Sequence, residues 1–202
     1  MLIDSGGQYL DGTTDITRTI AIGSVPIETV RLNTLVLKGM IAISCLRFPK
    51  GLAGRDIDAI ARQALWSVGL DFDHGTGHGV GSFLSVHEGP HGISRHNQVP
   101  FEPGMIISNE PGYYEEGHFG IRIENLIYVK KATNSKDTNS REMLKFETLT
   151  LAPIDQTLID ISLLSHQERK WINDYHANVL EKLYDLVSGS AKKWLNLACA
   201  PL

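Results

Sequence analysis

Four acidic side chains lie inside segments whose apolar and β-branched neighbours predict β-strands. They are Asp4, Asp15, Glu110 and Glu124. A carboxylate inside a strand is disfavoured both by β-propensity and by burial unless another group compensates its charge. Each acid taken alone is most simply explained as a solvent-facing strand residue or as an ion-pair partner. Four of them together constrain the fold much more strongly, because all four must be accommodated at once.

The first two acids are expected on one β-hairpin. Residues 2–5 and 14–22 predict its two strands, and the glycines and Asp11 between them predict a long loop. If these strands pair, the carboxylates of Asp4 and Asp15 can face each other about 5 Å apart.

The other two acids are expected on a second pair of strands. Residues 104–109 and 119–130 predict these strands, with a turn at Pro111. Glu110 ends the first strand and Glu124 lies inside the second. This hairpin can present a second carboxylate pair in the same way as the first.

The charge of these acids points to metal ions. Arg18 and Arg122 are close to two of the acids in the sequence and could pair with them. Two arginines cannot neutralise four buried carboxylates, whereas two divalent cations balance four negative charges with four positive ones. This arithmetic favours a dinuclear site over a mononuclear one.

A segment rich in glycine and histidine supplies a further candidate ligand. His74 and His78 lie in the run 74–81, where alternate glycines let the backbone approach another group closely, and His87 follows shortly after. The chain contains no dinucleotide-binding, phosphate-loop or H-E-x-x-H motif, and residues 11–15 lack the acids of a calcium loop. A lone histidine in such a loop is more often structural, but three beside four strand acids favour a metal centre.

The rest of the chain predicts helices and one more strand. The strand is expected at 145–151, and residues 133–141 predict a surface loop. Ser165 precedes Glu168 by three residues, which is the pattern of a helix-capping box. The expected helices span 26–48, 56–68, 165–187 and 190–198.

Composition excludes several classes of protein. The 202 residues are 42% hydrophobic, enough for a core, and the net charge of −4 with no basic cluster argues against a nucleic-acid partner. No apolar run reaches the roughly 18–20 residues of a membrane span. Cys45 and Cys199 predict reduced thiols in a cytoplasmic protein, and no signal peptide is expected. Because a strand begins so close to Met1, we expect an N-terminally truncated chain.

The motifs around these residues resemble those of the pita-bread metallopeptidases, and within them the aminopeptidase P (Xaa-Pro aminopeptidase) group. The tail segments 144–154 and 171–176 resemble the C-terminal extension of the large, three-domain form. The matching motifs occur in the order of that family at 2–9, 11–19, 74–81, 86–90, 109–114 and 120–125.

The resemblance implies an α+β, pita-bread fold with a curved antiparallel sheet and flanking helices. It implies that residues 1–144 form the catalytic dimetal domain, lacking its first part, and that residues 145–202 form the C-terminal extension. It also implies how the metal ligands are shared. Asp4 would be the terminal ligand of one metal, Asp15 and Glu124 would bridge the two metals, and His78 and Glu110 would bind the other metal.

The same resemblance implies the roles of the remaining site residues. His87 would contact the substrate at the scissile carbonyl, His74 would line the site, and Glu110 would also shuttle a proton. Arg122 would hold a ligand carboxylate in place.

The implied reaction is hydrolysis of the N-terminal Xaa-Pro bond, with release of the first residue, by a hydroxide that bridges two metals. The substrates would be peptides with proline in the second position, and a homodimer is compatible with the resemblance. Hard oxygen ligands with one imidazole suit Mn²⁺, with Zn²⁺, Co²⁺ and Fe²⁺ as alternatives. An Xaa-Pro dipeptidase and a non-catalytic binding module or inert fragment on the same fold remain open.

Overall fold

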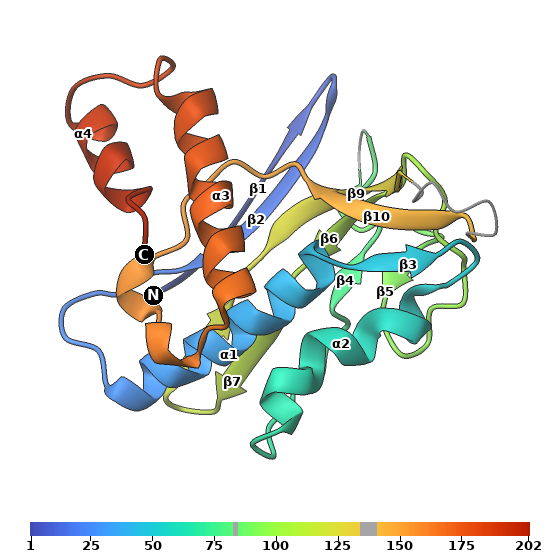
Figure 1. The fold of residues 1–202 in the computed structure, drawn as a ribbon, viewed down its shortest axis with the longest axis horizontal. Helices are drawn as coiled ribbons and strands as arrows, with labels where there is room; N and C mark the ends of the chain where they lie inside the picture. The colour runs from blue at the N-terminus through green and yellow to red at the C-terminus, as the bar shows by residue number, and fades with distance from the viewer. Residues whose placement is uncertain (83–84, 134–140) are drawn as a thin grey trace.

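The main sheet has four antiparallel strands in the order β3-β10-β9-β6 (Figure 1). The protein is described by a computed structural model that covers residues 1–82, 85–133 and 141–202. The strands span Arg47–Pro49 (β3), Met143–Thr148 (β10), Asn125–Lys131 (β9) and Ile106–Asn109 (β6). Because β3 pairs with β10 near the other end of the chain, the sheet ties the first and last thirds of the molecule together.

Two helices pack against this sheet. They are α1 (Ile27–Ser44) and α2 (Gly54–Trp66), and they also pack against each other. Buried side chains from the helices, such as Ile43 and Ile57, form one apolar cluster with Ile127 and other strand residues. Burial of this apolar surface is the main force that holds the helices on the sheet.

Three two-stranded ribbons carry the segments singled out in the sequence. The first, β1 (Leu2–Tyr9) with β2 (Gly12–Thr19), extends from the body of the molecule (Figure 1). The second is β4 (Gly77–His78) with β5 (Gly92–Ile93), and the third is β7 (Gly112–Glu115) with β8 (Phe119–Arg122).

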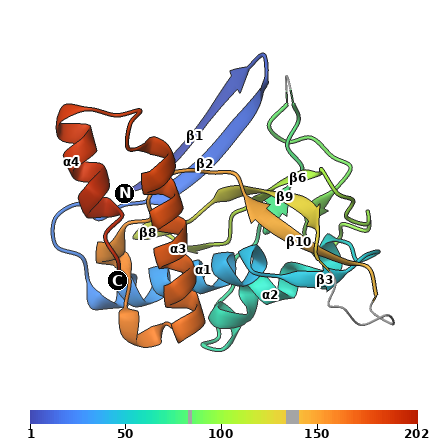
Figure 2. The same ribbon diagram turned by 45° about the horizontal axis from the view of Figure 1, so that its top comes forward.

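The C-terminal residues form two short 3₁₀ turns and two helices, with α3 beside the base of the β1–β2 ribbon (Figure 2). The predicted capping box is confirmed, because Ser165 Oγ accepts from the Glu168 N–H and Glu168 Oε2 accepts from the Ser165 N–H. Ile172 and Val179 of α3 join α1 in a second buried cluster. The elements are η1 (Gln156–Leu158), η2 (Ile161–Leu163), α3 (His166–Leu183) and α4 (Gly189–Ala198).

The predicted α+β class and all four predicted helices are confirmed, with shifted ends. The first helix stops at Ser44 instead of about residue 48, because residues 47–49 pair with β10. The third helix ends at Leu183, and the strand predicted at 145–151 spans 143–148. Among the described residues, none of the helices combines the length and apolarity that a membrane span needs.

Two predictions about strands were wrong. The first hairpin has long strands joined only by Leu10 and Asp11, because Gly6 and Gly7 lie inside β1 rather than in a loop. The strand predicted at 119–130 is broken at residues 123–124 into β8 and β9, which pair with different partners. Most of the loop predicted at 133–141 lies outside the described residues.

Candidate metal centre

Asp4 and Asp15 lie on the same face of the first hairpin. Asp4 is opposite Thr17 and Asp15 is opposite Gly6, so the two acids are diagonal neighbours. The prediction that they lie directly opposite each other was therefore wrong. Each acid is two residues away from the position opposite the other, on the same face of the hairpin. Ligand oxygens of Asp4, Asp15 and Glu124 nevertheless lie within 4.8 Å of one another.

Glu110 and Glu124 flank the last pair of the β6–β9 ladder, Asn109 with Asn125. Glu124 lies at the break between β8 and β9, and not inside a strand as predicted. Its backbone N–H donates to the carbonyl of Thr17 over 3.0 Å, and Thr17 Oγ1 donates to Glu124 Oε2 over 2.8 Å. The break thus lets Glu124 leave its own ladder and join β2 next to Asp15.

His78 brings the imidazole into the same site from β4. Its Nε2 lies 3.1 Å from Glu110 Oε1 and 3.4 Å from Asp15 Oδ2. Its Nδ1 lies 2.9 Å from the carbonyl of Gly79, which can only accept, so Nδ1 carries a proton and Nε2 faces the acids. The approach needs glycine at 77, because a Cβ there would be 1.8 Å from the carbonyl oxygen of Ser108.

The acids carry more negative charge than their protein partners offset. Burial, with the nearby charges of Glu110 and Asp15, raises the pKa of Glu124 to about 8. Burial alone would lower the pKa of His78, but hydrogen bonds to Asp15 and Glu110 raise it to about 10. Glu124 Oε1 is buried and has no hydrogen-bond partner. A cation among these oxygens would satisfy that atom and replace the repulsion with attraction.

The donor set fits divalent cations. Its atoms form three overlapping groups, each within 4.8 Å, and all five predicted ligands are included. The groups are Asp4, Asp15 and Glu124; His78, Glu110 and Glu124; and Asp15, His78 and His87. The first two groups share only Glu124, which is the arrangement expected when one carboxylate serves two ions. Oxygen donors with few imidazoles are typical of hard or borderline divalent metals.

Arg122 organises the solvent side of the centre. Its Nη2 contacts Asp4 Oδ2 at 2.5 Å, and its Nε donates to Thr17 Oγ1. Tyr114 OH accepts from Arg122 Nη1 at 3.2 Å and lies 2.8 Å from His74 Nε2. Among the described residues, Asp15 and Glu124 form no ion pair with lysine or arginine, so Arg122 relieves only part of the charge.

Tyr114 and Thr17 were not identified from the sequence. Thr17 follows Asp15 by two positions, so strand alternation alone would have placed its side chain on the same face. Tyr114 follows Glu110 by four residues and lies in β7, and no local pattern indicates that its hydroxyl meets His74.

His87 lies at the open side of the centre. It is exposed, and its ring centroid is 4.0 Å from that of His78. Together with Gly7, Asp15 and Val86 it lines an open groove of about 570 Å³ between the first hairpin and the loop before β5. Two of the predicted ligands, Asp4 and Asp15, therefore lie in the wall of a space large enough for a short peptide.

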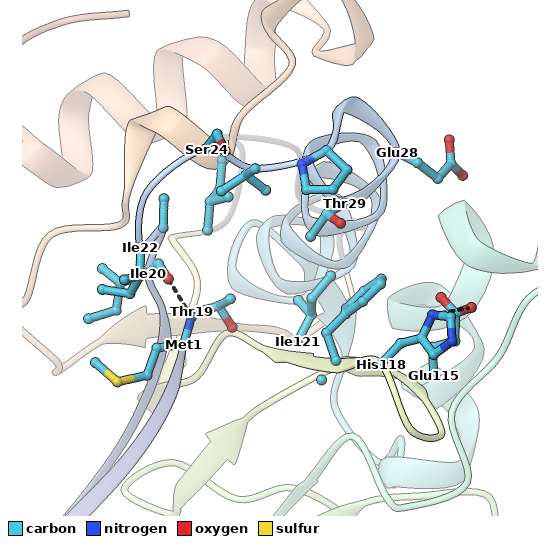
Figure 3. Close-up of a pocket in the computed structure, with 16 residues that line it drawn as sticks. Met1, Thr19, Ile20, Ile22, Ser24, Glu28, Thr29, Glu115, His118 and Ile121 are labelled. Atoms are coloured by element: carbon cyan, nitrogen blue, oxygen red, sulfur yellow. Dashed lines mark hydrogen bonds and ion pairs between the residues drawn. The ribbon is translucent and has the colours of Figure 1, made fainter.

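A second hollow, largely apolar and about 460 Å³, lies away from these residues (Figure 3). It is formed by the end of β2, the start of α1 and the β7–β8 ribbon, with Ile20, Ile22 and Ile121 in its lining. None of the seven predicted site residues lines it. The first groove, in contrast, is lined by three of them, Asp4, Asp15 and His87.

Comparison with known proteins identifies the class of this fold and site as metallopeptidase. The chain belongs to metallopeptidase family M24, whose profile matches residues 1–131. Residues 142–202 match the profile of the C-terminal region of peptidase M24. The predicted pita-bread fold is thereby confirmed.

Individual relatives agree with this assignment. The chain is 50% identical over its whole length to "Probable Xaa-Pro aminopeptidase P" of Laccaria bicolor and 52% identical to the protein of that name from Tuber melanosporum. It spans about a third of the length of these relatives, 32% and 33%.

Solved structures give the same picture. An X-prolyl aminopeptidase from Caenorhabditis elegans, described as a cytosolic enzyme with a di-nuclear active site, matches all of this chain with a TM-score of 0.93 and 44% identity. This chain covers 33% of that structure. A dipeptidase from Pyrococcus horikoshii matches 76% of this chain with a TM-score of 0.62 and 30% identity, and this chain covers 39% of it.

Proposed function

We propose that this chain carries the catalytic centre of an Xaa-Pro aminopeptidase, which hydrolyses the bond between the first residue of a peptide and a proline in the second position. The observation that carries the proposal is that five side chains converge on one small volume from the β1–β2 ribbon, from β4, from the end of β6 and from the break between β8 and β9. They are Asp4, Asp15, His78, Glu110 and Glu124. The relatives named Xaa-Pro aminopeptidase support the substrate class.

Five side chains would hold two divalent metal ions. Asp4 would bind one metal, His78 and Glu110 the other, and Asp15 and Glu124 would bridge both. When bound, such a pair supplies a hydroxide nucleophile near neutral pH and polarises the substrate carbonyl. We propose Mn²⁺ as the metal, because the donor set has four carboxylates and one imidazole.

Three residues would act on the substrate: Glu110, which would also hold a metal, His87 and His74. Glu110 Oε1 accepts from Ser108 Oγ over 2.8 Å, which fixes the carboxylate where it can receive a proton and deliver it to the leaving proline nitrogen. His87, exposed at the groove, would donate a hydrogen bond to the oxygen that becomes negative as the carbonyl is attacked. His74, held by Tyr114, would line the site on the side of Arg122.

An Xaa-Pro dipeptidase is the second candidate, since a dipeptidase is among the similar structures. The C-terminal region argues against it, because the aminopeptidase structure matches the whole chain whereas the dipeptidase matches 76%. We propose that residues 1–144 form the catalytic part and residues 145–202 the extension, a boundary that falls inside β10. We also propose a cytoplasmic location, as described for the enzyme from Caenorhabditis elegans, and a homodimer.

Metal content and peptide cleavage test the proposal. The purified chain, loaded with Mn²⁺ and freed of excess metal, is expected to retain two ions and to release the first residue of an Xaa-Pro-Xaa peptide. An Xaa-Ala-Xaa peptide is the matched control and should remain intact. Cleavage of only the dipeptide Xaa-Pro would favour the dipeptidase. Retention of two ions without cleavage of any peptide would favour a binding module or inert fragment.

A further inference from the structure

Arg18 is a basic residue beside the metal centre that the proposed reaction does not use. It follows Thr17 on β2, so its side chain points to the face of the hairpin opposite Asp15 and Thr17. Six oxygens lie within hydrogen-bond distance of its five N–H groups, and every one of them is neutral. An arginine that surrounds itself with carbonyls and hydroxyls in this way joins segments of backbone instead of neutralising an acid.

The acceptors belong to three separate parts of the chain. Arg18 Nη1 donates to the carbonyls of Thr17 and Glu124, the latter at 2.5 Å, and Nη2 donates to Asn125 Oδ1 at 2.7 Å. The other three contacts reach the C-terminal region. They are the carbonyls of Pro153 at 3.0 Å and Ala152 at 2.8 Å, and Tyr175 OH at 3.0 Å.

Together with the contacts of Thr17, the Arg18 contact bonds both the backbone and the side chain of Glu124 to β2. The Glu124 N–H donates to the Thr17 carbonyl, its own carbonyl accepts from Arg18, and its carboxylate accepts from Thr17 Oγ1. Glu124 lies at a break between two strands and lacks a ladder partner of its own. The direction of its carboxylate therefore depends on where the Arg18 guanidinium is held.

Tyr175 holds the guanidinium from the other side. It is a buried residue of α3, and its ring stacks on Trp171 with centroids 5.2 Å apart. Its hydroxyl accepts from Arg18 and lies 2.8 Å from the carbonyl of Ala152. Figure 2 shows α3, which carries Tyr175, beside the base of the β1–β2 ribbon, which carries Arg18.

We propose that Arg18 and Tyr175 are positioning residues through which the C-terminal region sets Glu124 for metal binding. This inference rests on the proposed function, because it takes Glu124 as a metal ligand. Residues 142–202 would then help to build the metal centre, although none of them is a metal ligand.

The experiment compares Tyr175→Phe with Val179→Ala in the 202-residue chain. Val179 lies in the same helix, is fully buried, and sits in the apolar cluster shared with α1. Calorimetric titration with Mn²⁺ is performed below the melting temperature of both variants. Tyr175→Phe is expected to weaken the lower-affinity Mn²⁺ site about tenfold, as when a single hydrogen bond to a charged group is lost. Val179→Ala is expected to keep wild-type affinity within about twofold, although it loses more core packing.

A second measurement needs no metal. Hydrogen exchange at the Glu124 amide of the metal-free chain is expected to accelerate in Tyr175→Phe and to stay at the wild-type rate in Val179→Ala. Unchanged Mn²⁺ affinity in Tyr175→Phe, or an equal loss in Val179→Ala, would overturn the inference. A wild-type chain that takes up no Mn²⁺ would refute the proposed function instead, and the amide exchange then decides separately whether Tyr175 holds Glu124.

Discussion

Thr17 Oγ1 donates a hydrogen bond of 2.8 Å to Glu124 Oε2 and so joins two residues that are 107 positions apart in the chain. This bond satisfies one carboxylate oxygen of a nearly fully buried acid, while the other, Oε1, has no partner. A carboxylate oxygen of this same acid lies within 4.8 Å of ligand oxygens of Asp4 and Asp15. Buried polar atoms are rarely left unpaired, and a cation bound beside Glu124 would satisfy this oxygen.

The bridging acids can be tested one at a time. Asp15→Asn or Glu124→Gln removes one of the charges that two cations would share, so either variant is expected to retain at most one Mn²⁺ per chain. Asp11→Asn, in the exposed loop of the same hairpin, is the matched control and should retain two. The measurement is metal content after removal of free Mn²⁺. Two equivalents in either bridging variant would contradict the assignment.

His87 is expected to act on the substrate and not on the metals. His87→Ala should leave metal content unchanged and lower kcat by about 10²–10³, the usual effect of losing one donor to a developing oxyanion. Steady-state kinetics on an Xaa-Pro-Xaa peptide, with metal analysis of the same sample, checks this. Because His87 also lies within 4.8 Å of ligand atoms of Asp15 and His78, loss of metal in this variant would instead make it a ligand.

The buried ion pair of α2 is expected to stabilise the loop that carries the histidines. Arg62 Nε lies 2.8 Å from Asp58 Oδ2, both side chains are nearly inaccessible, and Arg62 also donates to the carbonyl of His74. Asp58→Asn should lower the free energy of unfolding by about 3 kcal/mol, because it leaves a buried charge undercompensated. Asp174→Asn, which breaks an exposed pair, should change it by less than about 0.5 kcal/mol. Urea denaturation of both variants measures the difference.

His176 is expected to make stability depend on pH. Burial, with the charge of Arg18, lowers the pKa of His176 from its usual value near 6.5 to about 4. Between these values the unfolded chain binds a proton that the folded chain excludes, so stability is full above about pH 6.5 and falls as the pH drops toward 4. The loss can reach about 3 kcal/mol.

Denaturation of the wild type and of His176→Gln at pH 7 and pH 5 checks this expectation. His176 accepts a hydrogen bond from the Ile154 N–H, which glutamine can also accept, so the variant is a fair control. The variant should lose less stability than the wild type between these two pH values. Equal losses would show that His176 is not responsible.

The candidate site was largely predictable because its residues break local rules. Acids inside strands and histidines among alternating glycines are unfavourable unless something compensates them, and the five expected ligands do converge. The bounds of the strands, in contrast, depend on contacts between residues far apart in the sequence. Gly6 and Gly7 predicted a loop, but their segment pairs with β2 as a regular strand. Local sequence cannot show that pairing.

The break at Glu124 and the role of Arg18 were not predictable for the same reason. Residues 119–130 look continuous in the sequence, and only the bonds from Glu124 to Thr17 and Arg18 explain why the strand is interrupted. From the sequence, Arg18 could have paired with an acid, yet its partners are neutral oxygens of residues more than 100 positions away and of its own neighbour. Such three-dimensional contacts have no local signature.

The two-residue connection at Leu10 and Asp11 fixes the register of β1 against β2, and the metal centre depends on that register. Side chains alternate between the two faces of a ribbon, so inserting one residue between Asp4 and Tyr9 would carry Asp4 to the face occupied by Arg18 and leave Asp15 where it is. Every ligand would still be present in the chain, and the hairpin would still form. Adding the same number of residues to both strands between the acids and the turn would keep Asp4 and Asp15 in register on one face, so the ribbon can be lengthened by matched additions to β1 and β2.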